Sequence, residues 1–95
     1  MSPEELRALW DESGRVVLQD QYAAEMAGHA CLEGALALVY MRLGAERPGP
    51  LALPADLAER DPRAASLLRR YVRAPDARAR YVFLGDLLDH VLEGR

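Results

Sequence analysis

The stretch that decides the fold is residues 20–43, which read DQYAAEMAGHACLEGALALVYMRL. It is rich in Ala, Leu and Met, which are strong helix formers, and it contains no proline. Its apolar residues fall on nearly every face of a helix, and such a helix is buried on several sides. Gly28 and Gly34 would let neighbouring helices approach closely. We therefore predict a central, buried helix over this stretch.

The composition of the whole chain extends this prediction. Ala, Leu and Arg occupy 44 of the 95 positions, and the only β-branched residues are six Val, too few for a sheet. A chain of this length forms one small domain with a single core. We predict a single domain over residues 1–95, all-α, arranged as a four-helix up-and-down bundle.

Local signals divide the chain around the central helix. Ser2 followed by Pro3 and Glu5 predicts the start of a first helix, which should end or bend at Ser13-Gly14. Gly44 reads as the C-terminal cap of the central helix.

The second half of the chain contains further breaks. The Pro/Gly-rich residues 47–50 predict a linker between the second and third helices, followed by a short helical turn after Leu53-Pro54. Asp61-Pro62 should start the third helix, and Pro75-Asp76 should separate it from a last helix over 77–92.

Two groups of acidic and histidine side chains are candidates for a metal site. Glu25, His29 and Glu33 are spaced four residues apart, and Asp86 and His90 repeat that spacing on the last helix. Di-metal bundles instead use a Glu-x-x-His spacing, which is absent. We expect no metal or other cofactor, with a carboxylate/histidine metal bundle as an alternative. We expect His29 to be held by a nearby carboxylate and His90 to interact with the helix dipole.

Catalytic signatures are missing from the sequence. Cys31 is the only cysteine and lies in an apolar helix, where a thiol is a core group with a raised pKa. There is no G-x-S-x-G elbow and no glycine-rich phosphate loop. We therefore expect the protein not to be an enzyme.

Charge is distributed unevenly along the chain. Acidic residues dominate residues 1–33, and arginines dominate residues 60–80. We expect the arginines to form an interaction surface, with these candidates: Arg69, Arg70, Arg73, Arg78 and Arg80. They would contact the acidic helices of the same chain, a second copy in a homodimer, or a protein partner. Nucleic acid is an alternative that the overall charge of −3 does not favour.

One family resemblance rests on residues 22–38 and on the last third of the chain. YAAEMAGHACLEGALAL at 22–38 resembles the second helix of the HEPN superfamily, with Glu33, Ala35, Leu36 and Gly44 at matching positions. Two further stretches are similar to the HEPN-like C-terminal helical domains of nucleotidyltransferases: residues 53–57, and Asp76-Ala77-Arg78-Ala79-Arg80 leading into Leu84, Leu87 and Leu88.

The resemblance implies a binding role and not a nuclease. HEPN ribonucleases carry R-x-x-x-x-H, but Ala24 precedes His29 by five residues and Gly85 precedes His90 by five. The resemblance thus implies an accessory, substrate-binding subunit of a nucleotidyltransferase. Our leading prediction from the residues themselves is a non-catalytic interaction or assembly module, dimeric or bound to a protein partner.

Our expectation for the cellular location rests on the lack of a secretory signal and of a membrane-spanning stretch. The acidic first 15 residues do not resemble a secretory signal, and the apolar stretch at 35–41 is too short to span a membrane. We expect a cytoplasmic protein without membrane contact.

Overall fold

The computed structural model describes residues 1–94. Over that range the chain forms five α-helices and no strand, which confirms the prediction of an all-α protein. The helices are α1 (Pro3–Val16), α2 (Gln21–Leu43), α3 (Leu53–Arg60), α4 (Pro62–Arg73) and α5 (Ala77–Glu93). None of these five is both long and apolar enough to cross a lipid bilayer.

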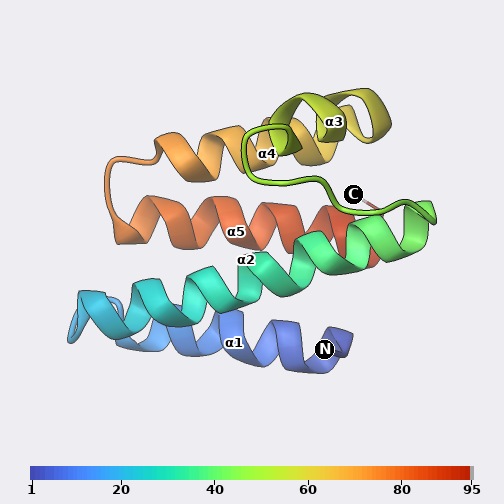
Figure 1. Cartoon of the computed structure of the whole chain (residues 1–95). Coiled ribbons are helices and arrows are strands. Elements are labelled where there is room, and N and C mark those ends of the chain that lie inside the picture. The colour runs from blue at the N-terminus through green and yellow to red at the C-terminus, as the bar shows by residue number, and fades with distance from the viewer. Residues whose placement is uncertain (95) are drawn as a thin grey trace.

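α5 lies between the two sides of the molecule. α1 packs against α2 and α5, and α4 packs against α5 and α3. In Figure 1, α1 follows one side, α3 and α4 follow the opposite side, and α2 and α5 run between them. α4 is therefore an edge helix, and its outward side carries the exposed residues Arg69, Arg70, Val72 and Arg73.

α3 is the one helix that we did not expect, because we predicted only a short helical turn after Leu53-Pro54. α3 is eight residues long and is held to α2 by Tyr40, whose hydroxyl donates to Asp56 Oδ2 at 2.7 Å. Arg47 in the preceding linker pairs with Glu33 of α2 at 2.7 Å. These contacts fold the linker back and place α3 beside α4, so the structure has five helices where we expected four.

The first helix does not end at Ser13-Gly14, because α1 continues through both residues to Val16. Both residues serve packing instead. The Ser13 hydroxyl donates to the carbonyl oxygen of Ala24 at 3.0 Å, which joins α1 to α2. A Cβ at Gly14 would lie 2.4 Å from the Tyr81 ring, so glycine leaves the space that this ring fills.

The other helix boundaries follow the local signals. Ser2 forms the predicted capping box with Glu5, and three aspartates cap the starts of α2, α4 and α5: Asp20, Asp61 and Asp76. Gly44 ends α2 in the left-handed conformation at φ 66°, as predicted.

All five helices contribute residues to one hydrophobic core. Leu67 of α4 and Leu84, Leu87 and Leu88 of α5 are fully buried. A Cβ at Gly34 would lie 2.6 Å from Leu6 Cδ2, so this glycine does permit the close approach of α1 to α2.

Candidate functional site

The five metal candidates do not come together in the structure. Glu25 forms an ion pair with Arg80, and His29 Nε2 lies 4.0 Å from Glu33 Oε1 on the exposed side of α2. Among residues 1–94, no three His, Cys, Asp or Glu side chains are grouped as metal ligands. Glu33 is further occupied by Arg47, and this ion pair lowers the pKa of its carboxyl group.

His90 has a partner that sequence spacing did not indicate. It contacts Asp61 at the start of α4, and its Nε2 lies 2.9 Å from Oδ1 and 3.0 Å from Oδ2. Asp61 Oδ1 also accepts a hydrogen bond from the backbone N–H of Ala64 at 3.1 Å. We expected His90 to interact with the helix dipole; in the structure its ring also makes a contact that joins the end of α5 to the start of α4.

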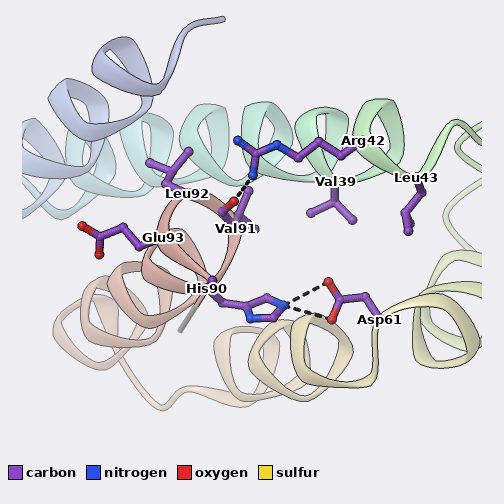
Figure 2. Close-up of a pocket in the computed structure, with 9 residues that line it drawn as sticks. Val39, Arg42, Leu43, Asp61, His90, Val91, Leu92 and Glu93 are labelled. Atoms are coloured by element: carbon purple, nitrogen blue, oxygen red, sulfur yellow. Dashed lines mark hydrogen bonds and ion pairs between the residues drawn. The ribbon is translucent and has the colours of Figure 1, made fainter.

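A hollow of about 360 Å³ adjoins this pair. Figure 2 shows the His90 ring directed at Asp61 from one helix to the next, and Glu93 directed away from them. The Arg42 guanidinium donates to the carbonyl oxygen of Val91, which fastens the end of α2 to the end of α5. The residues that line this hollow contain no hydroxyl or thiol group, so the pair has no adjacent nucleophile of those types to activate.

Cys31 is a core residue. Its side chain is fully buried, and its thiol donates to the carbonyl oxygen of Leu6 at 3.3 Å. Burial raises the pKa of the thiol to about 11, because the charged thiolate would lose its hydration. This agrees with the predicted raised pKa and leaves little thiolate at neutral pH.

The five arginine candidates separate into paired and unpaired groups. Arg80 bonds to Glu25 and donates to the carbonyl oxygen of Ala74 at 3.3 Å. The expected contact between the arginine-rich segment and the acidic N-terminal part of the chain is thus made by Arg80. Ion pairs within residues 1–94 include none of the other four candidates: Arg69, Arg70, Arg73 and Arg78.

Three of the unpaired arginines lie together on the outward side of α4. We call Arg69 and Arg73 the arginine ridge: they are four residues apart, lie on one face of the helix, and line hollows on both sides. Arg70 lines one of these hollows. Arg78 instead lines a hollow between α1 and α5 and lies outside this group.

The two hollows beside the arginine ridge contain apolar side chains. The α3-side hollow, of about 290 Å³, is lined by Pro54, Ala65, Leu68, Arg69, Val72 and Arg73. The α5-side hollow, of about 490 Å³, is lined by Ser66, Arg69, Arg70, Arg73, Ala74, Pro75 and Phe83. Val72 is 69% exposed, so a branched apolar side chain lies in water directly beside two cations.

Sequence reasoning identified the arginines but not the apolar residues between them. Val72 has the helical spacing of a core residue, after Leu68 and Ala65, and its exposure follows from α4 being an edge helix. Pro54 and Phe83 come from other helices and join the site only through the fold.

Comparison with known proteins identifies no relative of this chain: no family model, no curated protein and no solved structure matches it.

Proposed function

We propose that the chain is a non-catalytic, protein-binding helical module, and that the arginine ridge with its two hollows binds an acidic, partly apolar segment of a partner. The observation that supports this proposal most is the group of Arg69, Arg70 and Arg73 without ion pairs beside the exposed Val72. Charged side chains within residues 1–94 do not neutralise this surface, which supports its being available to a partner.

The chemistry of the surface indicates the kind of segment that fits. Guanidinium groups bind carboxylates through two parallel hydrogen bonds, and Arg is frequent where binding energy is concentrated. The hollows on both sides accept apolar side chains. A helix with Glu or Asp beside Leu-type residues would meet both requirements along the uncovered side of α4.

The same surface fits nucleic acid less well. Single-stranded nucleic acid is bound by positive grooves with several aromatic side chains on which bases stack. Phe83 is the one aromatic residue that lines the two hollows, and the chain carries a formal charge of −3. An apolar, arginine-flanked surface favours a protein segment.

The absence of a catalytic role is also part of the proposal. Cys31 is buried with a raised pKa, and His90 is occupied by Asp61 without a neighbouring hydroxyl or thiol. These two residues join helices and fill the core, which is a sufficient reason for their presence.

Binding of a labelled helical peptide with Leu and Glu at helical spacing tests this proposal. The variant Arg69→Glu/Arg73→Glu should bind it at least about tenfold more weakly than the wild type at low salt, because like charges then face each other. The control variant Arg15→Glu/Arg78→Glu changes the net charge equally but alters no residue of the two hollows. It should bind within about twofold of the wild type.

Two comparison ligands complete the experiment. A peptide with Gln in place of Glu should bind weakly, because it lacks the carboxylates. A labelled single-stranded oligonucleotide should bind more weakly than the acidic peptide. The proposal would be contradicted if the ridge variant and the control variant lost peptide affinity equally, or if the wild type did not bind the acidic peptide at low salt. It would also be contradicted if the oligonucleotide bound more tightly than the acidic peptide.

A further inference from the structure

The opposite side of the molecule carries a hollow of the opposite charge. This hollow, which we call the α1 hollow, has a volume of about 410 Å³ and lies between α1 and the end of α5. Its lining includes Pro3, Glu4, Ala8, Asp11 and Leu92. Like the surface of α4, it combines charged groups with small apolar ones.

Two of the carboxylates that line the α1 hollow, those of Glu4 and Asp11, are not neutralised within the described part of the chain. Ion pairs within residues 1–94 include neither Glu4 nor Asp11. Arg7 also lines the hollow, but its guanidinium lies 2.8 Å from Asp89 and 3.4 Å from Glu93, so its charge is already balanced. The α1 hollow is therefore a negative surface.

The two surfaces are complementary in pattern as well as in sign. On α1, the exposed Ala8 lies between Glu4 and Asp11 along one helix face. On α4, the exposed Val72 lies beside Arg69 and Arg73. Each face thus places an apolar side chain beside charges of one sign. Opposite charges on two such faces steer the two molecules together and orient them.

We propose that the acidic segment bound by the arginine ridge is α1 of a second copy of this chain, an inference that rests on the proposed function. α1 meets the charge requirement derived for the partner, because Glu4 and Asp11 lie outside the ion pairs, and Pro3, Ala8 and the adjacent Leu92 of α5 supply the apolar groups. Charge complementarity thus identifies the occupant of the α4 surface as the chain itself.

The positions of the two surfaces determine the form of the assembly. α1 and α4 lie on opposite sides of the molecule, separated by α2 and α5 (Figure 1). A copy that places its α1 on the α4 of a neighbour therefore still presents its own α4. Such a head-to-tail contact forms open chains, or rings where the rotation closes, and does not end at a two-fold dimer.

Sedimentation velocity of the full chain tests this inference. At low salt the weight-average mass should rise with concentration beyond that of a dimer, and at roughly 0.5 M salt it should fall to that of a monomer, since screening shortens the range of the charges. Two variants reverse one surface each: Glu4→Arg/Asp11→Arg on α1, and Arg69→Glu/Arg73→Glu on α4. Each alone should remain monomeric at low salt.

An equimolar mixture of the two variants is the decisive sample. The α1 variant keeps its basic α4, which fits the acidic α1 of the α4 variant. The basic α1 of the α1 variant also fits the acidic α4 of the α4 variant, so association should return. Circular dichroism checks that both variants fold. Because Arg in the first turn of α1 opposes the helix dipole, Glu4→Gln/Asp11→Asn serves as a milder variant that should also be monomeric.

Failure of this inference is distinguishable from failure of the proposed function. A wild type that stays monomeric at low salt, or folded variants whose mixture stays monomeric, would overturn the second copy as the partner. The α1 variant should still bind the acidic Leu/Glu peptide, because its arginine ridge is intact. Binding of that peptide without self-association would leave the proposed function standing and assign the surface to a different protein.

Discussion

At the scale of single residues, two glycines decide how closely α1 and α5 pack. The rings of Trp10 and Tyr81 are stacked with centroids 4.5 Å apart, and Trp10 Nε1 donates to the carbonyl oxygen of Tyr81 at 2.9 Å. A Cβ at Gly85 would lie 2.7 Å from Trp10 Cζ2, and one at Gly14 would lie 2.4 Å from the Tyr81 ring. Glycine at these positions makes room for the stacked rings.

Substitution of Gly85 by alanine should therefore destabilise the protein. We expect Gly85→Ala to lower the free energy of unfolding by about 1–3 kcal/mol, because the displaced ring must lose its packing. The control is Gly28→Ala, where the nearest atom to the new Cβ, Ser13 Oγ, lies 3.4 Å away. It should be neutral or stabilising by up to about 1 kcal/mol, the helix propensity that alanine adds.

Urea unfolding followed by the fluorescence of Trp10, the only tryptophan, measures both variants. A Gly85→Ala protein as stable as the Gly28→Ala protein would show that the ring stacking does not depend on that space.

At the scale of helices, Asp61 connects three elements. It follows α3, its carboxylate caps α4 through the N–H of Ala64, and the same carboxylate binds His90 near the end of α5. Asp76 caps α5 through the N–H of Ala79 at 2.9 Å and has only this capping role among the described hydrogen bonds. Comparing the two aspartates therefore distinguishes the stability that a helix cap contributes from the stability that the Asp61–His90 contact contributes.

Asp61→Ala should cost more stability than Asp76→Ala. We expect about 1 kcal/mol for the lost cap in each variant and about 1 kcal/mol more for the lost contact with His90. In a His90→Ala background the additional loss at Asp61 should vanish. Thermal or urea unfolding of the two aspartate variants in each background measures this, with the wild type and His90→Ala as references. Equal costs for Asp61→Ala and Asp76→Ala in both backgrounds would mean that the His90 contact contributes nothing.

The sequence predicted those helix boundaries that depend on adjacent residues. The caps at Ser2, Asp61 and Asp76 lie within four residues of the groups they bind, and proline is accepted in the first turn of a helix but not in its interior. The uninterrupted α1 and the full helix α3 were missed, because Ser13 and Tyr40 make their contacts with other helices. Such contacts cannot be derived from local patterns.

The candidate site was predictable to a similar extent. Clustering in the sequence was enough to select the arginines, since five of them fall within residues 69–80. Which of them are free for a partner depends on the fold: Glu25, which occupies Arg80, is 55 residues away in the sequence. Asp61 is likewise 29 residues from His90.

At the scale of the whole molecule, the fold sorts charge onto opposite sides. The formal charge of −3 conceals a basic surface on α4 and an acidic surface on α1, with α2 and α5 between them. Within the described chain, Arg80 and Glu25 link the arginine-rich segment to the acidic N-terminal part. Glu4 and Asp11 on α1 and Arg69 and Arg73 on α4 remain exposed, and the proposed head-to-tail contact between copies rests on these charges.

The central claim is that the arginine ridge of α4 is the binding surface, and amide chemical shifts of the isotope-labelled protein test it most directly. Titration with the acidic Leu/Glu peptide at low salt should shift the amides of residues 65–75 and of Phe83. Residues 39–43 and 90–93, around the His90–Asp61 hollow, should keep their positions. Shifts centred on His90 and Asp61, or no shifts at all, would contradict the account.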